Sequence, residues 1–153
     1  FPYTTLFRSV LELDTDGTKQ AEHFINAVGE DLSGRLIPAV EVRLRGLYRL
    51  LPPDYYEAAD NLADFCDRIE KQYGVRPVIY CTERTYKNIV VSDSRFNKDK
   101  IWYESLFSKP DEDMDWTFWT YTNRVKFSFY ESGEYLHMAV FNGSEVDFKK
   151  LII

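Results

Sequence analysis

The stretch LIPAVEVR, residues 36–43, decides the fold. It is apolar almost to its end, as expected for a strand covered on both faces, and Pro38 fits only the beginning of such a strand. Side chains two residues apart share one face of a strand, so Ala39, Glu41 and Arg43 lie on the same face. The opposite face is apolar and is expected to pack under helices. The stretch therefore predicts a buried strand that ends in two charged side chains.

A long helix and a second buried strand follow. Asp54 can cap the start of the helix, with Glu57 three residues later, and Gly74 follows its last turn. Spacings of three and four mark one buried face: Ala58, Leu62, Phe65, Cys66, Ile69 and Tyr73. Residues 76–82 have the character of another buried strand. The order strand, helix, strand predicts parallel pairing with a right-handed crossover.

The segment before this unit adds another strand and helix, whereas the segment after it is expected to be mostly strand. Residues 10–13 can end a strand, and residues 18–28 have one apolar helical face. After Thr82 the helical signal weakens, and three short aromatic strands and a closing helix are expected: 100–104, 116–122, 135–141 and, for the helix, 144–153. Because no repeat or linker interrupts the chain, we expect one α/β domain that is mostly β in its last part.

Composition and charge narrow the possible functions. The hydrophobic content of 44% is enough for a buried core, and the net charge of −6 disfavours a nucleic-acid partner, which needs a basic face. No apolar run approaches the roughly 20 residues of a membrane span. Cys66 and Cys81 are predicted to be free and packed. With two His residues and no Gly-rich phosphate loop, neither a metal nor a cofactor is expected.

The charged end of the 36–43 strand is the natural place for a site, because ligands of parallel α/β sheets bind beyond the carboxyl ends of the strands. Glu41 and Arg43 share a face there. Burying them is costly unless they are paired or hydrated. The alternative to a functional role is a plain Glu41–Arg43 ion pair at a strand end.

Five strand segments, in order, and the helix before the first of them resemble glycoside hydrolase family 25. LIPAVEVR is similar to the family strand that reads apolar-Pro-apolar-apolar-Asp-apolar-Glu, and QAEHF (20–24) is similar to the helix before it. The later segments resemble the following strands: YGVRPVIY (73–80), IW (101–102), WTFWTY (116–121) and LHMAVFNG (136–143). The resemblance implies a partial TIM-like β/α barrel, in the family form of five β/α units and then three strands, here lacking the first strands. It also implies cleavage of the β-1,4 bond between N-acetylmuramic acid and N-acetylglucosamine.

The catalytic positions that the resemblance implies are substituted. Glu41 stands at the family's Asp, Arg43 at its proton-donating Glu, and His137 at the Asp of the terminal segment, where Ala139 replaces Asn. A guanidinium, with a pKa above about 12, cannot donate a proton near neutral pH. His137 is expected to be a partly buried, hydrogen-bonded residue instead of a catalytic one. We therefore predict a catalytically impaired copy.

Aromatic side chains are the predicted sugar-binding groups. Tyr80, Trp102, Trp119 and Tyr121 occupy strand positions that could face the groove, where flat rings suit saccharides. Thr120 replaces the usual Gln and puts one hydrogen bond in doubt. For each aromatic residue, core packing is the equal alternative.

The resemblance implies peptidoglycan glycan strands as the partner, a monomer when complete, and a location outside the cell or at the bacterial wall, in a bacterial or phage context. Two functions remain open: a hydrolase that is active in the full-length parent, and a non-catalytic module that binds peptidoglycan. A third possibility is that the substitutions are sequence errors.

The segment FPYTTLFRS, residues 1–9, resembles a translated sequencing-library adapter. The alternative is a natural, irregular arm. The predicted division is therefore a non-native segment over 1–9 and a partial family 25 domain over 10–153. The first family strand, with another catalytic Asp, would then precede Val10. Unpaired strand edges beside such a gap predict poor solubility.

Overall fold

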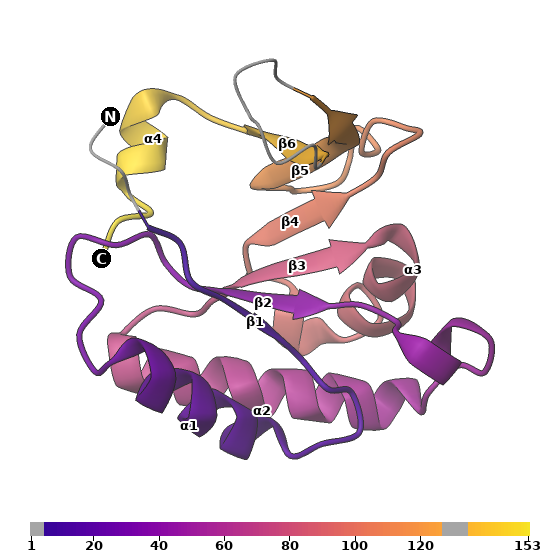
Figure 1. The fold of residues 1–153 in the computed structure, drawn as a ribbon, viewed down its shortest axis with the longest axis horizontal. Coiled ribbons are helices and arrows are strands. Elements are labelled where there is room, and N and C mark those ends of the chain that lie inside the picture. Colours follow the sequence, from indigo (N-terminus) through magenta and orange to yellow (C-terminus); the bar gives the residue numbers. More distant parts are fainter. Residues whose placement is uncertain (1–4, 127–134) are drawn as a thin grey trace.

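A computed structural model describes residues 5–126 and 135–153 of the chain. Its strands form one sheet in the order β1-β2-β3-β4-β5-β6 (Figure 1). Strands β1 to β5 pair in parallel, and β6 runs antiparallel to β5. The bounds are Arg8–Val10 (β1), Ala39–Val42 (β2), Val78–Thr82 (β3), Ile101–Glu104 (β4), Phe118–Val125 (β5) and Leu136–Phe141 (β6). This sheet confirms the predicted partial α/β barrel.

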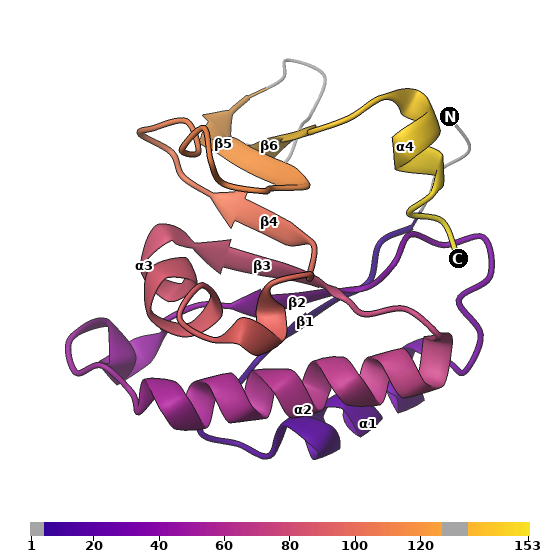
Figure 2. The ribbon, with the colours of Figure 1, turned by 180° about the vertical axis from the view of Figure 1, so that it is seen from behind.

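Two helices, α1 (Gly17–Val28) and α2 (Tyr55–Tyr73), lie side by side over one face of the sheet (Figure 1, Figure 2). The predicted ends of α2 are confirmed: the Asp54 carboxylate accepts a hydrogen bond from the backbone N–H of Tyr56 at 2.9 Å, and Gly74 has a φ of 73°. The weak helical signal after Thr82 corresponds to single turns. These are α3 (Glu83–Thr85), η2 (Tyr86–Val90) and η3 (Ser94–Phe96), while η1 (Gly46–Arg49) follows β2.

The two faces of the sheet carry separate cores. Val40, Val42 and Leu44 pack with the helices, whereas Ala39 belongs to a cluster on the opposite, concave face, as the alternation of the 36–43 stretch predicts. The concave cluster contains Leu36, Ile37, Ala39, Val78, Phe118 and Leu151. Each face of β2 is therefore buried by a different layer.

The C-terminal segment packs against the concave core beside the residues that precede β2. Helix α4 (Glu145–Lys149) is shorter than the predicted helix over 144–153. The reason is that the following residues pair as extended chain: the backbone N–H of Ile37 donates to the carbonyl of Leu151 at 2.8 Å, and Ile152 forms a bridge with Leu36.

The carboxyl ends of β1 to β5 meet along one edge of the curved sheet, which we call the mouth. It lies away from the chain termini and α4 (Figure 1). In α/β barrels this edge holds the ligand. Across residues 5–126 and 135–153, no helix is long and apolar enough to cross a membrane.

The N-terminal segment takes part in the sheet. Arg8 and Ser9 pair with Ala39 and Val40, and Phe7 packs against the helix-side core. Residues 1–4 of the segment attributed to an adapter lie outside the described residues. The adapter origin and the domain boundary at Val10 remain predictions.

Gly17 allows the close approach of α1 to α2. A Cβ atom at this position would lie 1.8 Å from the backbone oxygen of Asn61 on α2. Gly17→Ala is therefore expected to lower the free energy of unfolding by about 1–3 kcal/mol, the usual cost of overpacking a core. Denaturant unfolding would measure it. Lys19→Ala, at an exposed position of the same helix, should change it by less than about 0.5 kcal/mol; equal stability of the two variants would contradict the close contact.

Candidate active site

Glu41 lies on the concave face near the mouth and is 3% exposed. Three guanidinium groups surround its carboxylate: Arg43 Nε at 2.7 Å, Arg45 Nη2 at 3.1 Å and Arg8 Nε at 3.3 Å. Arg43 and Arg45 follow β2, while Arg8 comes from β1, where Val10 is the register partner of Glu41. Such pairing is what permits a carboxylate to be buried. The expected Glu41–Arg43 ion pair is thus present, within a larger group.

Arg43 connects two carboxylates. Its Nη2 donates to Glu104 Oε2 at 2.7 Å and to the Tyr80 hydroxyl at 3.3 Å. Burial acts to lower the pKa of Arg43, but hydrogen bonds to Glu104 and Glu41 outweigh it and raise the pKa above its ordinary value. The side chain at position 43 is therefore a permanent cation. We call Arg8, Glu41, Arg43, Arg45, Tyr80 and Glu104 the mouth cluster.

Glu104 is a site residue that the sequence reasoning missed. It ends β4, and its side chain is 9% exposed. The Tyr80 hydroxyl donates a hydrogen bond to it. A signal existed: Glu104 is a charge that closes an otherwise apolar strand, the same rule that selects Glu41. The family pattern instead directed attention to residues 41, 43 and 137.

The Glu104 carboxyl group is held ionised. Burial acts to raise its pKa, but hydrogen bonds from Arg43 and Tyr80 outweigh burial, and the pKa lies below its ordinary value of 4.5. Burial, reinforced by the hydrogen bond to Glu104, raises the pKa of Tyr80, so the phenol remains protonated. At neutral pH the pair is a carboxylate and a phenol, and the carboxylate is not a proton donor.

The lowered pKa of Glu104 predicts a stability that depends on pH. The ionised form favours folding; this contribution is complete above the ordinary pKa of 4.5 and is lost as the pH falls through the lower folded value. Wild type should therefore be more stable than Glu104→Gln at pH 7, and the difference should narrow below pH 4.5. Melting temperatures of both proteins at pH 7, 5 and 3 would measure it. A difference that stays constant would contradict the prediction.

Tyr80 and Trp102 share the concave face with Glu41. Glu41, Tyr80, Trp102 and Phe118 are successive register partners across β2 to β5. The Trp102 ring centroid lies 5.1 Å from those of Tyr80 and Phe118, and its Nε1 donates to Thr120 Oγ1 at 2.9 Å. Tyr80 is buried, whereas Trp102 is partly exposed. Two predicted sugar-binding residues are thus brought together beside the mouth cluster.

Trp119 and Tyr121 lie elsewhere, and the expectation that they face the groove is wrong. Trp119 alternates with Phe118 and Thr120 along β5, packs against the helix-side core and donates through Nε1 to the Ser105 carbonyl at 3.0 Å. The Tyr121 ring is 5.8 Å from that of Trp119, beside a register shift in the β5–β6 pairing. Both rings therefore belong to the convex side of the sheet.

His137 is exposed, so the expectation of a partly buried residue is wrong. It lies on β6 two residues from Ala139, whose register partner is Thr120 on the concave face. Its charge acts to lower the pKa of Glu104, which places it near the mouth cluster. Since an imidazole is either neutral or cationic, His137 cannot supply a permanent negative charge.

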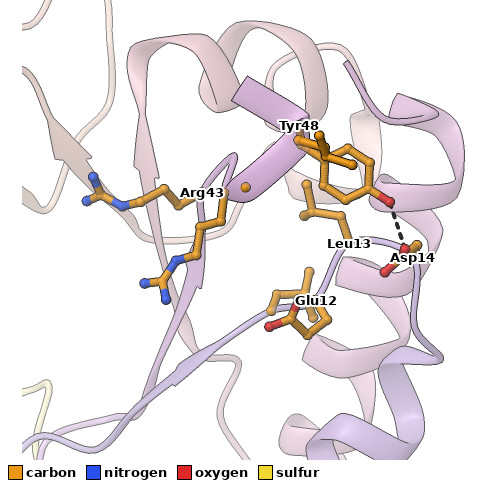
Figure 3. A pocket seen from close by; sticks show the side chains of 9 residues that line it. Glu12, Leu13, Asp14, Arg43 and Tyr48 are labelled. Carbon is orange, nitrogen blue, oxygen red and sulfur yellow. Dashed lines mark hydrogen bonds between the residues drawn. The ribbon is translucent and has the colours of Figure 1, made fainter. Parts of the chain in front are cut away.

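Two cavities adjoin the mouth cluster. One of about 400 Å³ is lined by the residues after β1 and β2, including Arg43 (Figure 3). The other, of about 460 Å³, is lined by the residues after β3 and β4, including Glu104. The Arg43–Glu104 ion pair thus connects a residue that lines the first cavity with a residue that lines the second. Among the described residues, no three His, Cys, Asp or Glu side chains gather as metal ligands.

Comparisons with known proteins agree with this architecture. The model of the family "Glycosyl hydrolases family 25" matches residues 7–128. A family 25 glycosyl hydrolase from Bacillus anthracis is 28% identical, with a TM-score of 0.83 over 95% of this chain and 67% of its own.

Two further solved structures share the fold at lower identity. A bacterial lysozyme from Streptomyces coelicolor is 20% identical, with a TM-score of 0.76 over 96% of this chain and 71% of its own. A muramidase from Trichobolus zukalii is 18% identical, with a TM-score of 0.71 over 90% and 67%. No curated protein sequence matches. Because the family model covers most of the chain and the half-barrel is the family's fold, the chain belongs to glycosyl hydrolase family 25.

Proposed function

We propose that this chain binds the glycan strands of peptidoglycan at its mouth and hydrolyses them poorly or not at all. Its family and its lysozyme and muramidase neighbours support peptidoglycan as the substrate. The observation that carries the proposed impairment is Arg43, a fixed cation between Glu41 and Glu104.

The reaction requires a group that the mouth cluster does not supply. A glycosidase protonates the leaving oxygen with a carboxylic acid, usually one whose pKa is raised, while a second group stabilises the oxocarbenium-like transition state. Arg43 cannot release its proton, and it favours ionisation of the carboxylates beside it. The lowered pKa of Glu104 and the raised pKa of Tyr80 leave neither group suited to donate a proton at neutral pH.

Glycan binding does not require that proton. Trp102 offers a partly exposed ring, while Arg43 and Glu104, which contact the neighbouring Tyr80, offer polar atoms. Aromatic faces with a few convergent polar groups are the usual means of holding a sugar. We propose Trp102 as the ring that contacts the glycan, with Tyr80 holding the charged groups in place. The site of action would be the bacterial cell wall, and the active form a monomer.

Co-sedimentation with purified peptidoglycan and clearing of a cell-wall suspension would together test the proposal. Wild type should bind peptidoglycan, should not bind cellulose, and should clear the suspension no faster than buffer. Trp102→Phe should weaken binding about fivefold, because part of the aromatic contact, worth about 1 kcal/mol, is lost. The matched variant Trp119→Phe, on the convex side, should bind as wild type does.

Two results would count against the proposal. Clearing by the wild-type chain would contradict the impairment and leave an active lysozyme. Failure of the folded protein to bind peptidoglycan would contradict the binding role.

A further inference from the structure

The 400 Å³ cavity carries charges that a neutral sugar does not need. It lies between the residues that follow β1 and those that follow β2 (Figure 3). Arg43 and Arg45 form one part of its lining, and Glu12, Asp14 and Tyr48 form another. In Figure 3 the Arg43 guanidinium and the Asp14 carboxylate lie on opposite sides, with Leu13 between them. The volume suits a small ligand.

The arginine side of this cavity carries more positive than negative charge. The mouth cluster contains three guanidinium groups and two carboxylates, joined by four ion pairs of 2.7 to 3.3 Å. The side chain of Arg45 is 54% exposed and makes one hydrogen bond, through Nη2 to Glu41, among the described residues. A guanidinium has five N–H donors, so Arg45 can also bind a carboxylate of a ligand.

The opposite side of the cavity offers carboxylates. Glu12 and Asp14 are exposed, and neither forms an ion pair within the described ranges. The Tyr48 hydroxyl donates to Asp14 Oδ2 at 2.7 Å, which orients this carboxylate and leaves its other oxygen able to accept. In Figure 3 the two carboxylates point to different parts of the cavity, and each can pair with a cationic group, such as an ammonium.

The loop that carries these carboxylates is fixed by side chains of both helices. Gln20 on α1 accepts from the Glu12 backbone N–H at 2.8 Å and donates to the Glu12 carbonyl at 2.9 Å. Asn61 on α2 donates to the Leu13 carbonyl at 3.0 Å. Since the backbone is held at Glu12 and Leu13 and the Asp14 side chain is held by Tyr48, the charge separation across the cavity is preformed, which lowers the entropic cost of binding.

We propose that this cavity binds the peptide stems of peptidoglycan, as a zwitterionic peptide whose carboxylate meets Arg45 and whose ammonium meets Glu12 and Asp14. The inference rests on the proposed function, because the stems are attached to the glycan strand that the mouth would hold. A peptide with both charges matches the two sides of the cavity, whereas a stripped strand, which keeps a carboxylate on each N-acetylmuramic acid but no ammonium, leaves Glu12 and Asp14 unused.

Two forms of one ligand test the proposal: soluble glycan strands that carry their stems, and the same strands after an amidase has removed them. Wild type should bind the stem-bearing strands about tenfold more tightly, because charged hydrogen bonds are gained. The variant Glu12→Gln/Asp14→Asn should lose most of this preference, because only the contact of the ammonium is removed, and its affinity for stripped strands should be unchanged. The control Glu30→Gln/Asp64→Asn removes two exposed carboxylates from the helix layer and should keep the preference. Melting temperatures would show that all three proteins are folded.

The possible failures are distinguishable. Equal binding of both forms by wild type, a preference retained by Glu12→Gln/Asp14→Asn, or a preference lost in the control would overturn the stem site and leave the glycan site intact. Wild type that binds neither form would overturn the proposed function, and the stem site with it.

Discussion

Arg43→Glu should raise the rate of cell-wall clearing about 100-fold or more above that of the wild-type chain, the lower end of what a general acid contributes. The new carboxyl group would lie beside two carboxylates, Glu41 and Glu104, which Arg43 now contacts at 2.7 Å. Like charges raise a carboxyl pKa, and a raised pKa is what a proton donor needs. Turbidity of a cell-wall suspension, followed over time, would give the rate.

Arg43→Glu both removes a cation and adds a proton donor, and Arg43→Gln distinguishes these two effects. It also removes the cation and its ion pairs, but it adds no titratable proton, so clearing should stay at the wild-type level. Clearing that rises equally in both variants would mean that removal of the cation is sufficient. If Arg43→Glu is folded by circular dichroism and still inactive, the lack of a proton donor at position 43 does not explain the proposed impairment.

Glu41→Ala should lower the free energy of unfolding by about 3–5 kcal/mol, the usual cost of removing one partner from a buried ion pair. Glu41 is 3% exposed and is the shared partner of Arg8, Arg43 and Arg45. Without it, the cluster would retain three guanidinium groups and only Glu104 to balance them. Denaturant unfolding at pH 7 would measure the loss.

An exposed glutamate provides the control for this loss. Glu83 pairs with Lys87 at 2.6 Å, and both side chains are more than half exposed. Glu83→Ala should therefore cost less than about 1 kcal/mol. If the two alanine variants were equally stable, the cluster around Glu41 would not contribute to folding in the way its burial suggests.

The strand and helix pattern could be predicted because its signals are local. The alternation in residues 36–43 identified the two faces of β2, and Asp54 and Gly74 marked the ends of α2. The C-terminal segment was predicted less well, since its last residues pair with residues 34–37, which are distant in sequence. Backbone pairing between distant residues cannot be recognised from the spacing of apolar residues, from which helices are predicted.

The site could be predicted only in part. Spacing placed Glu41 and Arg43 on one face, but it could not indicate that Arg8 reaches Glu41 or that Arg43 reaches Glu104. Those contacts depend on the register of three neighbouring strands. In the segment WTFWTY both faces carry aromatic residues, so hydrophobicity alone could not assign Trp119 to the convex side.

The two cysteines lie in the interface between α2 and β3. Cys66 on α2 and Cys81 on β3 are both free and fully enclosed, as predicted, and burial raises the pKa of each thiol. Because the thiolate is the reactive form, an alkylating reagent cannot modify either one in the closed protein. Each thiol can react only while the helix has separated from the sheet, so the rate of thiol labelling reports how often this interface opens.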